Sequence, residues 1–397
     1  MLVLNPQTTQ FVEEHENDDI RKLALKSNTN PEVDLSAALM QIAGRQSAKE
    51  KIPFWYAHKN ILYPGHLPLE QCSSQITATY KASLCKGETL TDLTGGLGID
   101  FAFMSVNFQQ STYVEQQEVL CRLADHNFRI LGLKEIKIVH GNGVDFLKQM
   151  EPVDCIFIDP ARRNEHGRKT VGISDCEPDI KKLSGFLIEK ADKTIIKLSP
   201  MLDITQALSD MPMAGELHIV SADNECKELL LILNKKKPED KTQVHCINIK
   251  KDRLQRFIFD YGQESNTSCE FTSIPEKYIY EPNSSILKAG AYKLTARFYQ
   301  LKKFHPNSHL YTSDLLIKEF PGRIFEYRNL FSLNKKEVRT ELNGISKANI
   351  TVRNFPESVD SLRKRLKLKE GGDIYLFATT LENDRKVILH CSRLTNS

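Results

Sequence analysis

Apolar and amphipathic stretches alternate through the middle of the chain. Short apolar or β-branched runs predict buried strands at 89–93, 111–115, 136–140, 153–158, 194–198 and 217–220. Between several of them, apolar residues recur at helical spacing, as at 99–106 and 120–131. A short helix around 226–233 and strands at 244–249 and 257–261 complete the pattern. Strands that alternate with helices predict an α/β fold with a parallel, doubly wound sheet.

The pattern differs on both sides of this central stretch. Residues 1–85 form a predicted N-terminal helical region, because apolar residues recur three and four positions apart there, with little β-branched clustering. After a polar linker at 262–268, residues 270–397 predict a small α+β domain. Its predicted elements are helices at 286–301 and 359–366 and strands at 323–331, 350–353 and 374–378. The α/β domain would then span residues 86–262.

Composition narrows the class of protein. The 397 residues are 40% hydrophobic and 26% charged, which is typical of a soluble globular protein. The sequence has no apolar run of about 18 residues and no signal-peptide pattern, so we expect a cytoplasmic protein without a membrane span. Its nine cysteines form no C-x-x-C pair. Such a scattered set favours reduced thiols over disulfides, and no metal site is predicted.

Positive charge is concentrated near the C-terminus. The net charge of the chain is only +3, but residues 301–397 hold 18 Lys and Arg against 11 Asp and Glu, a net of +7. The remaining residues therefore carry a net charge of −4. A basic C-terminal region indicates a polyanionic partner, most simply nucleic acid, although a solvated charged surface explains the same numbers.

A glycine-rich turn joins the first predicted strand to the helix after it, in the sequence Asp92-Leu-Thr-Gly-Gly-Leu-Gly-Ile-Asp100. Such a turn brings bare backbone close to a ligand, but many enzyme classes share it. Its neighbours narrow the choice. Glu115 ends the second strand about 20 residues past the first glycine, where a carboxylate can accept both ribose hydroxyls of a nucleoside. Asn142 follows the third strand and Asp159 the fourth, and open α/β sheets bind ligands at these carboxyl ends.

In this order of motifs the chain resembles the class I S-adenosylmethionine-dependent methyltransferases, whose sheet is Rossmann-like. The resemblance covers roughly residues 86–249. More narrowly, residues 92–100 and Asp159-Pro160-Ala161-Arg162 look like a bacterial family whose methyltransferase domain precedes a THUMP-like domain. The segments 280–290, 311–314 and 362–368 support this. THUMP domains are RNA-binding modules, so the resemblance implies RNA as the partner.

The resemblance implies S-adenosyl-L-methionine as the cofactor and assigns two sets of residues. The expected catalytic residues, facing the target nucleotide, are Asp159, Pro160 and Arg162. The expected cofactor-binding residues are Asp92, Thr94, Gly95, Gly96, Gly98, Asp100, Glu115, Gln116, Asn142, Gly143 and Asp159. Asp92 has an alternative role, which is to cap and orient the glycine loop.

The fourth-strand motif departs from the pattern of amino-group methyltransferases. Those enzymes hold the target base with an Asp/Asn-Pro-Pro-aromatic tetrad, whereas Ala161 and Arg162 stand here in place of the second proline and the aromatic residue. Arginine can clamp a phosphate or stack through its guanidinium plane instead. Methylation at C5 of a pyrimidine is disfavoured, because no cysteine lies near the strand at 194–198.

Two groups of basic residues are candidates for contact with RNA phosphates. One lies just past the site and comprises Arg162, Arg163, Arg168, Lys169 and Lys197. The other is the cluster Arg363, Lys364, Arg365, Lys367 and Lys369. Solvated surface charge is the alternative explanation for each group.

The sequence therefore predicts a methyltransferase that acts on RNA, either tRNA or rRNA. Two rival classes stay open. One is a small-molecule or protein methyltransferase whose tail serves for oligomerisation, and the other is a non-catalytic RNA-binding protein that kept the fold. A nicotinamide dehydrogenase is a distant third, because the motif Asp159-Pro160 has no role in it.

Overall fold

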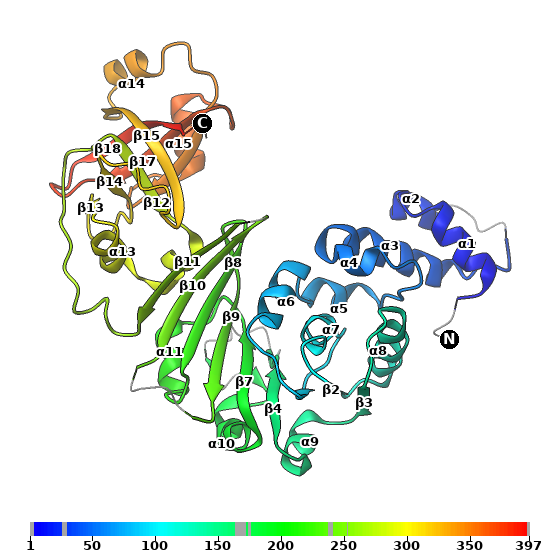
Figure 1. Ribbon diagram of the computed structural model, residues 1–397. Coiled ribbons are helices and arrows are strands. Elements are labelled where there is room, and N and C mark those ends of the chain that lie inside the picture. Colours follow the sequence, from blue (N-terminus) through cyan, green and yellow to red (C-terminus); the bar gives the residue numbers. More distant parts are fainter. Residues whose placement is uncertain are drawn as a thin grey trace. The chain divides into compact units, whose positions relative to one another are not determined.

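A computed structural model describes residues 4–25, 30–162, 172–173, 176–236, 241–251 and 253–394. The chain divides into two compact units (Figure 1). The first comprises residues 1–217 and 227–242, and the second residues 218–226 and 243–397. The three-part division expected from the sequence is finer than this one, and its boundaries stay predictions.

Six strands of the first unit lie in the order β9-β7-β4-β1-β2-β3. The five from β7 to β3 are parallel, as the alternation of strands and helices predicts. Their buried residues are largely apolar on both faces, as a sheet covered by helices requires. The bounds are β1 Thr89–Asp92, β2 Gln110–Glu115, β3 Ile136–His140, β4 Val153–Ile158, β7 Ala191–Leu198 and β9 Glu225–Asn234.

The prediction of a helix around 226–233 is wrong, because these residues lie in β9, which is antiparallel to β7. Leu229 to Leu233 are all at most 1% exposed. A strand buried on both faces has a continuous apolar run, which periodicity cannot distinguish from a buried helix. Leucine, a strong helix former, favoured the wrong alternative, and burial in the sheet overrode its propensity.

Helices of the first unit flank its strands, and those nearest the N-terminus lie farther from the strands (Figure 1). Helix α6 packs beside α7, the helix that follows the glycine loop. No helix in the described part of the chain is long and apolar enough to cross a membrane. The helices are α1 Pro6–Glu14, α2 Ile20–Leu25, α3 Leu35–Lys51, α4 Pro53–Tyr56, α5 His66–Gln71, α6 Gln75–Ala82, α7 Ile99–Ser105, α8 Glu118–Ile130, α9 Gly143–Gln149, α10 Ile180–Lys190 and α11 Ile204–Asp210.

The second unit contains most of β8 together with the antiparallel hairpin of β10 and β11, in the order β11-β10-β8. It also contains a seven-stranded sheet of order β13-β14-β12-β15-β18-β17-β16. The strands are β8 Glu216–Ala222, β10 Gln243–Lys250, β11 Arg253–Asp260, β12 Tyr278–Pro282, β13 Lys302–Lys303, β14 Tyr311–Ser313, β15 Gly322–Phe331, β16 Asn349–Arg353, β17 Ile374–Thr380 and β18 Lys386–Arg393. A two-stranded ribbon, β5 Ala161–Arg162 with β6 Cys176–Glu177, belongs to the first unit.

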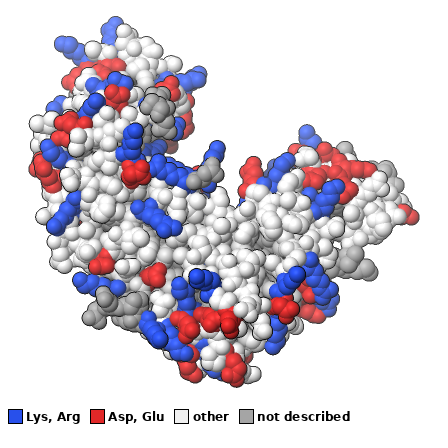
Figure 2. Space-filling model, in the orientation of Figure 1, with Lys and Arg blue, Asp and Glu red and all other residues white. Residues whose placement is uncertain are grey.

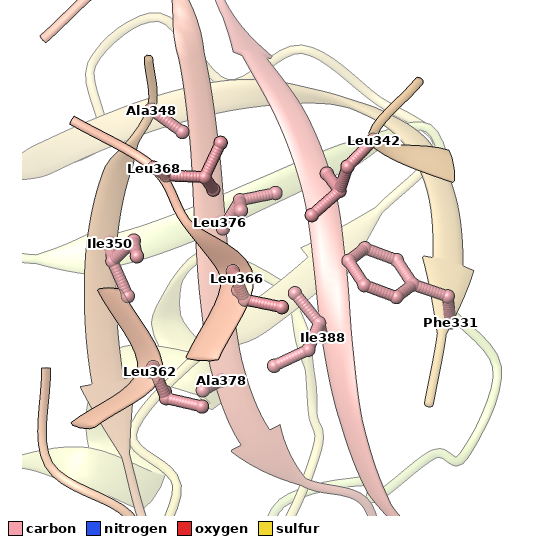
Figure 3. Close-up of a cluster of buried hydrophobic side chains, with 10 residues drawn as sticks. All are labelled: Phe331, Leu342, Ala348, Ile350, Leu362, Leu366, Leu368, Leu376, Ala378 and Ile388. Atoms are coloured by element: carbon pink, nitrogen blue, oxygen red, sulfur yellow. The ribbon is translucent and has the colours of Figure 1, made fainter. Parts of the chain in front are cut away.

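Helix α15 (Val359–Leu366) covers one end of the seven-stranded sheet. Leu362 and Leu366, four residues apart on α15, pack with Leu376 of β17 and Ile388 of β18 (Figure 3). The helix expected at 286–301 is instead two helices, α12 (Ser284–Ala289) and α13 (Tyr292–Phe298). Gly290 separates them in a left-handed conformation (φ 71°), which ends α12 as a C-cap glycine does. The remaining helix is α14, Lys335–Glu341.

Candidate functional site

The glycine loop turns from β1 into α7 at two positions where a side chain would not fit. A Cβ at Gly95 would lie 2.2 Å from the ring of Tyr113, so the backbone rests directly on that ring. Gly98 has a φ of 79° and is the N-cap of α7, a conformation that glycine adopts without strain. The tyrosine hydroxyl also donates to the carbonyl oxygen of Gly96. Tyr113 therefore fixes the course of the loop.

Glu115, at the end of β2, contacts the same loop. Its Oε2 accepts the N–H of Gly96 at 2.8 Å, and its Oε1 accepts the N–H of Gln117 at 2.8 Å. The residue is 9% exposed. An ionised carboxylate has about four lone-pair sites, so each oxygen keeps room for a hydroxyl donor from a ligand. The neighbouring Gln116 is exposed, and its carbonyl oxygen lies 3.0 Å from Nε2 of His140.

Thr94 joins the glycine loop to the end of β4. Its hydroxyl oxygen accepts the N–H of Asp159 at 2.7 Å, and its own N–H donates to Oδ1 of Asp92 at 2.9 Å. The structure thus gives Asp92 the orienting role that was its alternative in the sequence, while its contact with a cofactor stays a prediction. Burial raises the pKa of Asp92 to about 8, and the charges of nearby carboxylates act in the same direction, against the hydrogen bond from Thr94.

Lys197, on β7, connects Asp159 to α7. Its Nζ lies 2.5 Å from Oδ2 of Asp159 and 3.4 Å from Oδ2 of Asp100. Burial lowers the pKa of Lys197, but the negative charges around it outweigh burial and raise that pKa overall. The sequence offered Lys197 as a residue for gripping RNA phosphates. With a side chain only 14% exposed and two carboxylate partners, it is instead an internal cation.

Asp100 is a buried member of the same network, and its expected contact with the cofactor stays a prediction. Its Oδ2 accepts a hydrogen bond from the hydroxyl of Ser73 at 2.7 Å, and its Oδ1 lies 3.2 Å from Nζ of Lys81. Lys81 is fully buried and bonds both carboxylate oxygens of Glu228 on β9, at 2.5 and 2.7 Å. Burial raises the pKa of Asp100, but the charges of Lys81 and Lys197 outweigh it, so the pKa is lowered overall.

Sequence reasoning missed Ser73, Lys81 and Glu228. Ser73 and Lys81 belong to the predicted N-terminal helical region, and Glu228 to a segment expected to be helical. Lys81 and Glu228 are 147 residues apart, so no local pattern could have paired them. The one available signal was a charged residue next to a strongly apolar run, since a buried charge needs a partner.

The predicted residues at the end of β3 lie at the start of α9. The side-chain oxygen of Asn142 accepts the N–H groups of Val144 and Asp145, at 2.8 and 3.2 Å, and so caps the helix. Its side-chain NH₂ group is the part that a ligand could use. Gly143 packs against the backbone of Leu93, where a Cβ would lie 2.0 Å from the carbonyl oxygen.

The motif after β4 is described in part. Pro160 is buried, and Ala161–Arg162 form β5, paired with β6. The side chain of Arg162 lies outside the described part of the structure. The expected phosphate contacts Arg163, Arg168 and Lys169 also fall outside the described residues. All nine cysteines are free thiols, and Cys155 in β4 is 1% exposed.

The charges around the glycine loop favour a cationic ligand. Besides Asp92, four carboxyl side chains and two ammonium groups lie around the loop and its supports, so acidic groups outnumber basic ones in the described part of the site. The four are Asp100, Glu115, Asp159 and Glu228, and the ammonium groups belong to Lys81 and Lys197. Excess negative charge in a partly buried site attracts a positively charged ligand.

Comparison with known proteins gives matches at the C-terminus and over the whole chain. A family model described as THUMP domain-like matches residues 322–393, and one described as a ferredoxin-like domain matches residues 278–321. The crystal structure of a "putative methyltransferase" from Porphyromonas gingivalis W83 is 33% identical, covers 100% of both chains and has a TM-score of 0.89.

Two further solved structures are much less similar. TrmK of M. capricolum, in complex with S-adenosyl-homocysteine, is 15% identical over 41% of this chain and 68% of its own, with a TM-score of 0.32. An rRNA methylase from Streptococcus thermophilus is 12% identical over 40% of this chain and 94% of its own, with a TM-score of 0.31. No curated protein matches the sequence.

Proposed function

This chain belongs to the class I S-adenosylmethionine-dependent methyltransferases with a C-terminal THUMP-like domain, and we propose that it methylates RNA, either tRNA or rRNA. The observation that carries the proposal is the convergence of the glycine loop, Glu115 and Asp159 at the carboxyl ends of β1, β2 and β4. Ligands of open α/β sheets bind at this edge.

S-adenosyl-L-methionine fits the residues that are present. The ligand is a sulfonium cation without a phosphate, and among the described residues around the loop carboxyl groups outnumber ammonium groups. The bare backbone of Gly95, Gly96 and Gly98 leaves room for the methionine end. When bound, the cofactor would supply an electrophilic methyl group.

Four residues would hold the nucleoside end of the cofactor. Glu115 would accept the ribose hydroxyls through the lone pairs that Gly96 and Gln117 leave free. Gln116 and Asn142 flank it at the ends of β2 and β3, and the Asn142 amide would donate to the adenine edge. Gly143 lets α9 begin close against the loop.

Asp159, Pro160 and Arg162 would face the target nucleotide. Methyl transfer needs an acceptor atom aligned with the methyl group and, for some acceptors, a group that takes a hydrogen bond from it. Asp159 has a side chain 37% exposed, so its carboxylate can reach a bound base. Arg162 would clamp a phosphate or stack on the base.

The C-terminal region would bind the RNA. Figure 2 shows positive and negative side chains intermixed over the face in view. On α15 and the residues after it, however, Lys364, Lys367 and Lys369 are all exposed. Arg365 is paired with Glu357 at 2.5 Å, so the three lysines are the better candidates for phosphate contacts.

Calorimetry with S-adenosylmethionine tests the cofactor assignment. We expect Glu115→Ala to weaken binding strongly, because the ribose hydroxyls lose a charged acceptor. Glu118→Ala, three residues later on an exposed ion pair with Arg122, is the matched control. If Glu115→Ala bound S-adenosylmethionine with wild-type affinity, this result would contradict the cofactor assignment.

Two experiments separate the rival functions. Transfer of a radiolabelled methyl group into total RNA from cells lacking the gene tests activity, and persistent absence of label would favour a non-catalytic RNA-binding protein. Filter binding against bulk tRNA across a salt series tests the substrate class. An RNA enzyme loses affinity steeply with salt, whereas a small-molecule or protein methyltransferase does not bind the tRNA in this way.

A further inference from the structure

The Lys197–Asp159 ion pair lies at the point where the proposed site meets its buried support. We propose that Lys197 is a positioning residue for methyl transfer, which holds the Asp159 carboxylate in the orientation that receives the acceptor group of the substrate. This inference rests on the proposed function, because it assigns a role within that reaction.

The contact with Lys197 fixes one carboxylate oxygen of Asp159. Lys197 contacts Oδ2 of Asp159 at 2.5 Å. Within the described ranges, Oδ1 of Asp159 has no hydrogen-bond partner in the protein. The Asp159 side chain is 37% exposed, whereas that of Lys197 is 14% exposed, so Lys197 lies on the inner side of the pair. The inner contact with Lys197 thus orients the carboxylate, and in the proposed reaction Oδ1 would receive the acceptor group.

Lys197 is itself fixed from behind, which a positioning role requires. Its Nζ also contacts Asp100, and Asp100 is bonded by Ser73 and lies beside Lys81. Lys81 in turn bonds Glu228 at the far end of the network. Holding a long lysine side chain in one conformation costs conformational entropy. Contacts with two carboxylates can offset this cost, so the ammonium group is held rigidly.

The backbone of Asp159 is fixed as well. Its N–H donates to the hydroxyl of Thr94 at 2.7 Å, so the residue is tied to the glycine loop. Backbone and side chain are thus fixed independently, the first by the loop that would hold the cofactor and the second by Lys197. Removing Lys197 would free the side chain of Asp159 but not its backbone, and Asp100 would keep Ser73 and Lys81 as partners. We therefore expect the acceptor to lose its alignment while the cofactor still binds.

The experiment compares three single variants in methyl transfer to total RNA from cells lacking the gene, with calorimetry for S-adenosylmethionine. Lys197→Met should lower kcat about 100-fold, the effect of a misplacement of about 1 Å, with KM and cofactor affinity little changed. Lys197→Arg should restore most of the rate, since it keeps the charge. Lys193→Met is the matched control on the same strand, where Nζ bonds the carbonyl oxygen of Leu84 at 2.8 Å, and it should keep the wild-type rate.

A double variant keeps the proposal falsifiable if Lys197→Met does not fold. Asp159→Asn with Lys197→Met removes both charges together, and it should be no slower than Asp159→Asn alone, because Lys197 acts only through Asp159. An additional loss in the double variant would overturn the proposal. So would a wild-type kcat in Lys197→Met, a loss confined to KM or cofactor affinity, or a loss that Lys197→Arg does not restore. If the wild-type protein transfers no methyl group, the proposed function fails, and this inference fails with it.

Discussion

Gly95 lies against the ring of Tyr113 so closely that a Cβ at position 95 would be 2.2 Å from Cε2 of the tyrosine. The ring belongs to β2 and is fully buried, so it cannot swing out to make room. The side chain of one strand therefore sets the path of the loop that follows its neighbour. This relationship makes the loop sensitive to a single methyl group.

We expect Gly95→Ala to cost about 2 kcal/mol of unfolding free energy and to weaken S-adenosylmethionine binding about tenfold, because the loop must move off the ring. Urea unfolding and calorimetry measure the two effects. Gly185→Ala, where a Cβ would meet nothing within 4 Å, is the control. In Tyr113→Leu, the same alanine should cost less, and equal costs in both backgrounds would contradict the clash.

The raised pKa of Asp92 predicts a pH dependence of stability. Its pKa is about 8 in the folded protein against 3.8 for an ordinary aspartate, so between these values the folded state binds one more proton than the unfolded state. Stability contributed by the protonated group is therefore present at low pH and lost as pH rises toward 8. Between these two pKa values, the free energy of unfolding should fall by about 1.4 kcal/mol for each unit of rising pH.

Urea unfolding at pH 5, 6 and 7 tests this prediction against Asp92→Asn. The amide keeps an oxygen for the N–H of Thr94 but does not titrate in this range. The wild-type protein should lose stability relative to the variant as pH rises. Parallel curves for the two proteins would show that Asp92 is ionised in the fold.

The packing beneath α15 lets us predict how much stability the second unit loses when a buried side chain there is shortened. Leu362 is fully buried among Leu376, Ala378 and Ile388 (Figure 3). Leu362→Ala should destabilise this unit by about 3 kcal/mol in urea unfolding, through lost burial and the cavity left behind. Leu315→Ala is the control, because Leu315 is 71% exposed. Similar costs for both variants would contradict the packing.

The exposed lysines of the C-terminal unit predict a change in the salt dependence of RNA binding. Replacing Lys364, Lys367 and Lys369 together by Gln should weaken tRNA binding and reduce the slope of log K against log salt by about 2, if all three contact phosphates. Filter binding across a salt series measures the slope. The double variant Lys335→Gln and Lys336→Gln, on exposed residues of α14, should leave it unchanged. An unaltered slope in the triple variant would exclude this surface.

Elements with a strong local pattern could be predicted from the sequence. The strands 136–140 and 153–158 and the helix 359–366 lie where periodicity placed them, residue for residue. The glycine loop, Glu115 and Asp159 were identified from their order along the chain, and the structure brings them to one edge of the sheet. Local pattern suffices in these cases because each residue's role follows from its place at the end of a strand.

Only the tertiary structure decided which charges lie together. The sequence by itself determined the α/β class, the loop and the strand-end residues, since backbone geometry and hydrophobic period are local properties. It could not place Lys197 between Asp159 and Asp100, nor Lys81 against Glu228. The sequence pattern around a lysine on a strand is the same whether its side chain faces solvent or a buried carboxylate. Its partners come from distant segments, and burial of the charge becomes evident only once the sheet and its helices are packed.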